Sequence, residues 1–331
     1  MDPITDVAAR PNPFPARVPW FAVVVFFIVA CGLAWLVALP LWLGGNGLKN
    51  PFAGVILPAM MFTPLIAALF VVFVVQRPRP RPVAEYLGVW PLRPVKRTVW
   101  MIVIGLFGSV LIVIAGVFLA AALGLVKLDL VHFSGFANAL HAAGAPGLPI
   151  PVGMIVLIQL LTLPIGAIFN GLFTIGEELG WRGWLLPSLR PLGTWPALLI
   201  TGAIWGFWHS PIILLGYNFG QPNLAGIGLM IVGCMFYGIL IGWLRLRTGS
   251  VWPCVFAHGG FNAAAGFLGL VVAAGQHPNQ IALNPLGWAT WIVMAVAIVP
   301  LIASRQFTVQ PRLSASPYRS DSSPTAPGAV T

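Results

Sequence analysis

The stretch WFAVVVFFIVACGLAWLVALPLWLG, residues 20–44, carries no charged side chain and decides the class of fold. About 20 consecutive apolar residues in a helix cross a hydrocarbon core about 30 Å thick, so this stretch is long enough to span a membrane. Similar apolar runs follow at about 53–76, 99–124, 151–177, 194–216, 222–244, 251–275 and 286–304. The short alternating segments of a membrane β-barrel do not occur in the sequence. The sequence therefore predicts an all-α, polytopic transmembrane helical bundle with about eight spans.

The overall composition supports a membrane protein and argues against other classes. Hydrophobic residues make up 59% of the chain and charged residues only 7%, whereas soluble domains carry about 25% charged residues. The net charge of +10 comes from Lys and Arg in the loops between apolar runs, which is typical of topology signals and excludes nucleic acid as a partner. Three cysteines, Cys31, Cys234 and Cys254, lie inside apolar runs without CxxC spacing, so we expect buried thiols rather than disulfides.

The distribution of positive charge also predicts the orientation in the membrane. If the N-terminus is cytoplasmic, all but two of the 17 Lys and Arg residues fall on the cytoplasmic side, and the two exceptions are Lys49 and Lys127. This asymmetry favours an even number of spans with both termini in the cytoplasm. The first apolar run is longer than that of a signal peptide and no A-x-A cleavage site follows it, so we expect a retained anchor. The Pro- and Arg-rich chain looks bacterial, which places it in the plasma membrane.

The apolar runs divide the chain into three parts. Residues 1–19 are polar and rich in proline, and we expect a flexible cytoplasmic N-terminus. Residues 20–304 form the transmembrane bundle. Residues 305–331 are rich in Ser, Pro and Arg, and we expect a disordered cytoplasmic tail. No internal repeat and no second soluble domain are visible.

Two adjacent carboxylates, Glu177 and Glu178, close the fourth apolar run. A charge at the middle of a bilayer costs roughly 2.5–3.5 kcal/mol on insertion scales, so these residues need an explanation. A purely structural explanation is that both lie at the membrane interface and that Glu178 pairs with Arg182 one helical turn later. A functional explanation is that they belong to an intramembrane site.

Two histidines favour the functional explanation. His209 and His258 both lie within apolar runs. A single membrane histidine more often joins two helices than takes part in catalysis, but here each has a companion one turn away. Trp205 precedes His209 by four residues and Asn262 follows His258 by four, so each pair shares a helix face. The depths do not agree, because Glu177 ends a span while His209 lies about 22 Å into another span.

Such a set of side chains can activate water. A partly desolvated carboxylate is a stronger base, and a neighbouring histidine can orient the water or share its proton. Histidine and asparagine donors can stabilise the oxyanion of a tetrahedral intermediate. A base together with an oxyanion hole predicts an amide hydrolase that forms no covalent intermediate. The glycines around the carboxylates and after His258 allow close helix packing and leave room for water or a substrate backbone.

Three motifs in order resemble a known family. The sequences EELGWR at 177–182, WGFWH at 205–209 and HGGFN at 258–262 are similar to the EExxxR, FxxxH and HxxxN motifs of the CPBP family of intramembrane glutamic endopeptidases. This family includes the CAAX prenyl endoproteases and bacteriocin-processing proteins. The similar region covers about 160–275, roughly a third of the chain. Each motif alone is weak, but the three together use both membrane glutamates and both membrane histidines.

The resemblance implies a role for each matching residue. It implies that Glu177 activates water with the help of His209, and that His258 and Asn262 form the oxyanion hole. The catalytic set is thus Glu177, His209, His258 and Asn262, and the supporting set is Glu178, Arg182 and Trp205. Trp205 stands where the family motif has phenylalanine. The resemblance also implies no metal, no other cofactor, and a membrane-associated or prenylated protein or peptide as the substrate.

Three other functions compete with a glutamate-dependent protease. Two histidines and a glutamate could hold zinc with one open position, although no HExxH motif occurs. Intramembrane Glu and His could form the proton relay of a proton-coupled transporter, although the polar residues cluster on the cytoplasmic half and no inverted repeat is visible. The chain could also be a non-catalytic immunity or scaffold protein. The sequence leaves the substrate and the oligomeric state open, and it places the active site towards the cytoplasm.

Overall fold

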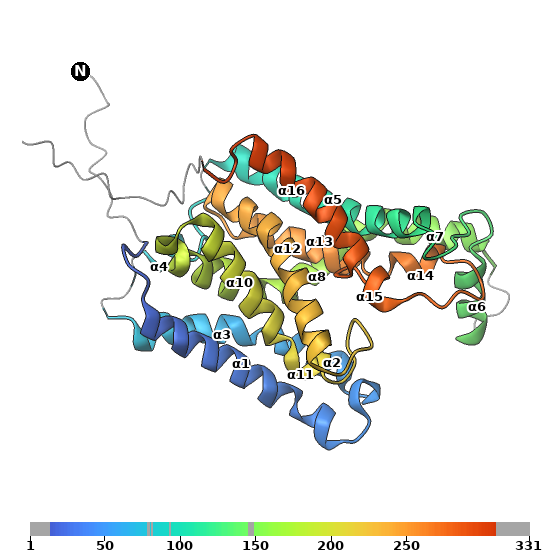
Figure 1. The fold of residues 1–331 in the computed structure, drawn as a ribbon, viewed down its shortest axis with the longest axis horizontal. Helices are drawn as coiled ribbons and strands as arrows, with labels where there is room; N and C mark the ends of the chain where they lie inside the picture. Colours follow the sequence, from blue (N-terminus) through green and yellow to red (C-terminus); the bar gives the residue numbers. More distant parts are fainter. Residues whose placement is uncertain (1–13, 78–79, 81, 93, 145–148, 309–331) are drawn as a thin grey trace, which may run out of the picture.

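The computed structural model describes residues 14–77, 80, 82–92, 94–144 and 149–308, and within them it is helical (Figure 1). Among these residues, Leu128 and Val272 form an isolated antiparallel β-bridge. The all-α prediction is therefore confirmed. The predictions for residues 1–13 and 309–331 lie outside the described residues.

The helices have the following bounds. The first half of the chain contains α1 (Trp20–Leu43), η1 (Gly47–Lys49), α2 (Ala53–Met60), α3 (Thr63–Phe70), η2 (Val71–Val75), α4 (Val83–Tyr86), α5 (Val95–Ala122), α6 (Ser134–Ala142) and α7 (Val152–Leu161). The middle contains α8 (Leu163–Glu178), η3 (Leu179–Leu185), α9 (Leu186–Leu189), η4 (Arg190–Leu192), α10 (Thr194–Trp208) and α11 (Ser210–Ile213). The last part contains α12 (Leu224–Thr248), α13 (Trp252–Ala264), α14 (Phe267–Val271), α15 (Gln280–Leu283) and α16 (Trp288–Ala303).

Six helical segments among the described residues are long and apolar enough to cross a membrane, and the bent pair Val152–Leu161 and Leu163–Leu192 makes a seventh if it is counted as one span. The six are Trp20–Leu43, Ala53–Val75, Val95–Ala122, Leu224–Thr248, Trp252–Val271 and Gln280–Ala303. These six segments and the bent pair together correspond to seven of the eight predicted runs. The chain is an integral membrane protein.

The remaining predicted span, 194–216, which is the fifth along the chain, differs from the structure. Helix α10 has only 15 residues and ends at Trp208, and the short helix α11 follows. Pro211 accounts for this end, because proline has no N–H to continue the helical ladder and its ring collides with the carbonyl four residues earlier. The segment is too short to meet the length required of a span by itself.

The centre of the bundle is formed by α8, α12 and α13 (Figure 1). Helix α13 packs against α5 on one side and α8 on the other, while α10 packs against α12 and α1 against α3. Gly259 and Gly260 allow this close packing, because a Cβ atom at Gly259 would collide with the Ala167 carbonyl of α8 and one at Gly260 would lie 2.8 Å from the Leu106 carbonyl of α5. The two glycines therefore serve helix packing.

Helix α8 has one apolar side and one polar side. Ile165, Ile168 and Leu172 are exposed, as expected of side chains that face lipid. Thr174 and Glu177 on the other side are buried. The Thr174 hydroxyl donates to the Val255 carbonyl of α13 at 3.0 Å, which fixes the rotation of α8 relative to α13. This rotation directs the acidic end of α8 into the protein.

Candidate active site

The two adjacent glutamates lie in the middle of a helical run rather than at its end. Helix α8 continues after Glu178 into the π-helical segment η3 and through α9 and η4 to Leu192. The prediction that Glu177 closes a span was therefore wrong, and the predicted mismatch in depth with His209 rested on it. A π-helical segment inside an α-helix often marks a functional site, because it costs hydrogen-bond geometry to maintain.

Glu177 faces the interior and is only 3% exposed. Its Oε2 atom accepts a hydrogen bond from the indole Nε1 of Trp205 at 2.6 Å. Trp205 lies on α10, four residues before His209. This bond connects α8 with α10 and fixes one carboxylate oxygen, while it leaves Oε1 of Glu177 for another partner.

Glu178 is the next residue of the helix, turned about 100° from Glu177, and is fully buried. Its Oε1 atom accepts hydrogen bonds from Arg182 at 3.0 Å and from Nδ1 of His258 at 2.9 Å. The Arg182 guanidinium also lies over the Trp205 ring, 4.3 Å from its centroid. A buried charge needs such partners, because desolvation alone would be very costly. The predicted pairing of Glu178 with Arg182 is confirmed, and His258 is a further partner.

His209 caps the end of α10 and is mostly buried. Its Nδ1 atom lies 2.9 Å from the backbone carbonyl of Trp205. A carbonyl can only accept, so Nδ1 carries the hydrogen and Nε2 is left as an acceptor in the neutral ring. The Trp205 residue therefore orients both Glu177, through its side chain, and His209, through its backbone.

A cavity of about 400 Å³ brings the four residues predicted as catalytic together. They come from three elements and all line this cavity: Glu177, His209, His258 and Asn262. Trp205 lines it as well, whereas Glu178 and Arg182 are not among its lining residues. The four residues of the predicted catalytic set and Trp205 of the supporting set thus form part of the cavity wall, while Glu178 and Arg182 do not line it.

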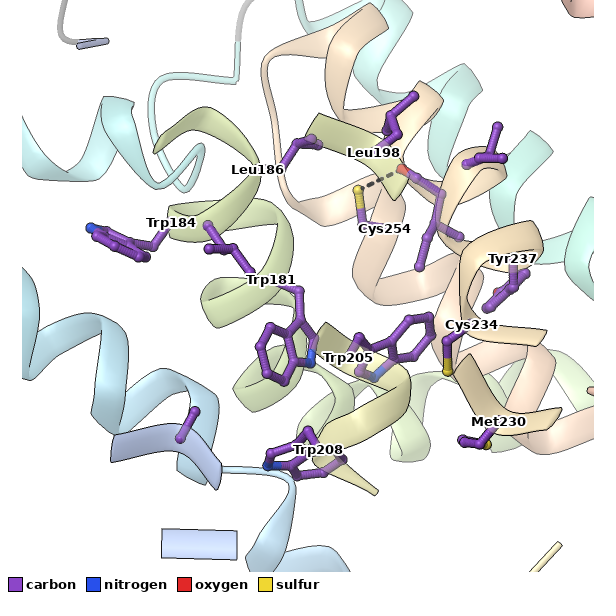
Figure 2. Close-up of a cluster of buried hydrophobic side chains, with 14 of the residues drawn as sticks. Trp181, Trp184, Leu186, Leu198, Trp205, Trp208, Met230, Cys234, Tyr237 and Cys254 are labelled. Atoms are coloured by element: carbon purple, nitrogen blue, oxygen red, sulfur yellow. Dashed lines mark hydrogen bonds between the residues drawn. The ribbon is translucent and has the colours of Figure 1, made fainter. Parts of the chain in front are cut away.

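A cluster of large aromatic side chains supports the wall of the cavity (Figure 2). Trp181 and Trp208 meet edge to face with ring centroids 6.0 Å apart, and the Trp208 indole donates to the Thr63 hydroxyl of α3 at 2.9 Å. Trp205 lies beside Trp181 in the same cluster (Figure 2). The Trp205 ring also packs against Tyr237 and His258, with ring centroids 6.2 Å and 5.2 Å away, and these contacts help to hold it in place.

The three cysteines are buried and free. Cys254 donates to the Ile241 carbonyl at 3.2 Å (Figure 2). None of them lines the cavity. Their role is packing.

Sequence reasoning missed several polar residues of the cavity wall. Tyr237 of α12 lies edge to face with His258, with ring centroids 6.4 Å apart, and its hydroxyl hydrogen-bonds to Ser109 of α5 at 2.9 Å. Asn170 of α8 also lines the cavity. It lies seven residues before Glu177, so the spacing of two helical turns could have revealed it. Tyr237 gave no such signal, because no motif connects it to the acidic pair.

The zinc alternative would use the same two histidines and a glutamate as ligands. Among the described residues, no group of three or more His, Cys, Asp or Glu is placed to hold a metal ion. His209 and His258 each hydrogen-bond through Nδ1 to a protein group, the Trp205 carbonyl and the Glu178 carboxylate, which leaves Nε2 of each ring for another partner.

Comparison with protein families supports the predicted resemblance. Residues 154–264 match the model of the Rce1-like family, the type II CAAX prenyl endopeptidases. This segment includes all seven residues of the two predicted sets, and it begins in α7 and ends with α13. No curated protein matches the chain. The match agrees with the resemblance of the three motifs, and an Rce1-like domain at these residues indicates a membrane protease of the CAAX type.

Proposed function

We propose that the Rce1-like domain of residues 154–264 makes this chain an intramembrane endopeptidase that uses a glutamate to activate water. The observation that supports this most directly is that Glu177, His209, His258 and Asn262 line one cavity. The substrate is a membrane-associated or lipidated protein or peptide. Neither a metal nor another cofactor takes part.

Glu177 is the general base in this proposal. The Trp205 indole holds its Oε2 atom, so Oε1 is left to take a proton from water. His209 orients that water through Nε2, because its Nδ1 is already occupied by the Trp205 carbonyl. As the water oxygen bonds to the carbonyl carbon of the substrate, its proton passes to Glu177.

His258 and Asn262 form the oxyanion hole. They are four residues apart on α13 and therefore lie on the same face of the helix. In its doubly protonated form His258 donates from Nδ1 to Glu178 and from Nε2 to the oxyanion, and the carboxylates of Glu177 and Glu178 together balance the positive charges of His258 and Arg182. The Asn262 amide supplies the second donor. When the C–N bond breaks, the proton on Glu177 moves to the leaving nitrogen, which yields a carboxylic acid and an amine.

The orientation in the membrane is part of the proposal. Helix α1 begins and α16 ends at the same end of the molecule (Figure 1). Together with the positive charge of the loops, this favours both termini and the active site on the cytoplasmic side of a bacterial plasma membrane. Reporter fusions at each terminus test the orientation, and a terminus found on the outer side would contradict it.

The central experiment compares two glutamates. Glu177→Gln keeps the size of the side chain and removes the base, so we expect loss of cleavage of membrane peptides with unchanged insertion and folding. Glu85→Gln is the matched control, because Glu85 lies in α4 and does not line the cavity. Normal cleavage by the Glu177→Gln protein would contradict the mechanism. A protein that never cleaves but carries protons across vesicles in a manner dependent on Glu177 would support the transporter alternative.

A further inference from the structure

A second cavity of about 330 Å³ lies beside the first one. It is placed where the chain breaks between α7 and α8, which meet at an angle of 52° around Thr162. The opposite wall comes from the end of α13 and from α14. Irregular backbone at membrane depth is tolerated where it is buried in protein or lines a cavity, so a broken helix at this place suggests a function.

Two carboxamide side chains line both cavities. They are Asn170 of α8 and Asn262 of α13. The two cavities therefore meet at this pair. Asn170 lies two turns before Glu177 on the same helix face, at a distance of about 10 Å along the axis. The Asn170 amide nitrogen donates to the Gly166 carbonyl at 2.9 Å, and its Oδ1 atom has no hydrogen-bond partner among the described residues.

The rest of the second cavity is mainly apolar. Leu160 and Leu163 form one side, and Phe267 and Leu270 form the other. An apolar chamber whose entrance carries amide groups suits an apolar side chain attached to a peptide backbone, because the backbone can hydrogen-bond to the amides. A lipid chain alone would fill the apolar part but would leave the Asn170 oxygen without a donor.

We propose that the second cavity is a substrate subsite that receives a large apolar side chain next to the scissile bond of an extended peptide. Oδ1 of Asn170 accepts a hydrogen bond from a backbone N–H of that peptide. This inference rests on the proposed protease function and deepens it. It assigns the apolar specificity to α7, α8 and α14 rather than to the helices that carry His209.

A pair of glycines provides the test. Gly266 lines the second cavity, and a Cβ atom there meets no heavy atom within 4 Å, so a larger side chain enters open space. Gly269 has the same free space but does not line the cavity. The Gly266→Phe and Gly269→Phe proteins are compared in proteoliposomes with internally quenched peptides that carry Ala or Leu at each position beside the cleaved bond.

At one of the positions beside the cleaved bond, we expect Gly266→Phe to lower kcat/KM about tenfold or more for the peptide with Leu. For the peptide with Ala at the same position, kcat/KM should stay nearly unchanged. Gly269→Phe should change neither. The inference is overturned if Gly266→Phe affects Leu and Ala peptides equally or affects neither. Asn170→Leu should raise KM about three- to tenfold with little change in kcat, and Asn170→Gln, which keeps the carboxamide, should recover part of the loss.

Photo-crosslinking separates a failure of the subsite from a failure of the proposed function. A peptide with benzophenone at the apolar position is bound to the Glu177→Gln protein, in which no cleavage is required. We expect the peptide to label the segment that contains Phe267 and Leu270. This labelling should be lost when Gly266→Phe is combined with Glu177→Gln, and it should persist when Gly269→Phe is combined with Glu177→Gln. If the peptide labels only other segments, the second cavity is not the proposed subsite. The same conclusion follows if a benzophenone fatty acid labels this segment and the peptide does not. Absence of cleavage by the wild-type protein rejects only the protease function.

Discussion

The indole nitrogen of Trp205 lies 2.6 Å from Oε2 of Glu177, and this hydrogen bond joins the helix of the acidic pair to the helix that ends at His209. The related family motif has phenylalanine at this position, which has no donor. Because Trp205 also receives the Nδ1 hydrogen of His209 on its backbone carbonyl, one residue positions two groups of the proposed site.

Replacement of Trp205 by phenylalanine tests this hydrogen bond. Trp205→Phe keeps an aromatic ring and removes the N–H, so Glu177 loses one partner while the packing largely remains. We expect kcat to fall about three- to tenfold with KM nearly unchanged, which corresponds to one hydrogen bond of about 0.5–1.5 kcal/mol. Trp195→Phe at the start of α10 is the control, because Trp195 packs on Phe307 and does not line the cavity. An unchanged kcat would show that the bond has no effect on the reaction.

The sequence predicted the membrane helices well, because apolar runs are a direct consequence of the lipid solvent. The sequence did not predict where a helix ends when contacts between helices determine its length. The sequence predicts that the two adjacent glutamates close the fourth run, yet the helical structure continues to Leu192. It can continue because Arg182 is neutralised by Glu178 inside the protein and does not face lipid.

The candidate site shows the same limits. Residue types and spacing singled out the polar residues of the apolar runs, the family resemblance selected the catalytic four among them, and all four line one cavity of the structure. The sequence placed Trp205 on the helix face of His209 and in the supporting set, but it did not predict the hydrogen bond to Glu177, because the atom that a tryptophan directs at a neighbour depends on the rotation of its helix. Asn170 was missed because an uncharged amide does not stand out from an apolar run.

The buried pair of Glu178 and Arg182 gives a prediction that separates stability from activity. Glu178→Gln leaves Arg182 without its anionic partner, and we expect a destabilisation of about 3–5 kcal/mol, seen as a lower unfolding midpoint in detergent. The double variant Glu178→Gln with Arg182→Met removes both charges and should recover much of the stability. It should not recover activity, because His258 still lacks the carboxylate that holds its Nδ1. Recovery of activity in the double variant would contradict a positioning role for Glu178.

Helix packing around α13 can be tested at one glycine. A methyl group at Gly259 would collide with the Ala167 carbonyl of α8, so Gly259→Ala should destabilise the protein by about 1–3 kcal/mol. Gly228→Ala on α12 is the matched control, because a Cβ atom there meets nothing within 4 Å. The control should be neutral or stabilising by up to about 1 kcal/mol, as alanine favours a helix. Equal midpoints for the two variants would argue against close packing of α8 and α13.

Removal of metals distinguishes the glutamate mechanism from the zinc alternative. We expect cleavage to continue at the same rate after incubation with EDTA and 1,10-phenanthroline, because Glu177 alone takes the proton from water. Metal analysis of the purified protein should accompany the assay, so that a tightly held ion is not overlooked. Activity that is lost with chelators and restored by zinc would favour a metal hydrolase built on the two histidines and Glu177.

Arg245 provides a final prediction, because it orders the segment that carries Arg182. It is fully buried on α12, and its guanidinium donates to three backbone carbonyls: those of Arg182 at 2.9 Å, Tyr86 at 2.7 Å and Gly249. Arg245→Lys keeps the charge but replaces the planar fork with a point charge, so at least one carbonyl loses its donor. We expect a loss of about 1–3 kcal/mol in stability and a smaller loss of kcat, whereas Arg77→Lys at an exposed position should change neither. If Arg245→Lys were as stable as the wild type, the guanidinium would not be needed to hold the π-helical segment behind the glutamates.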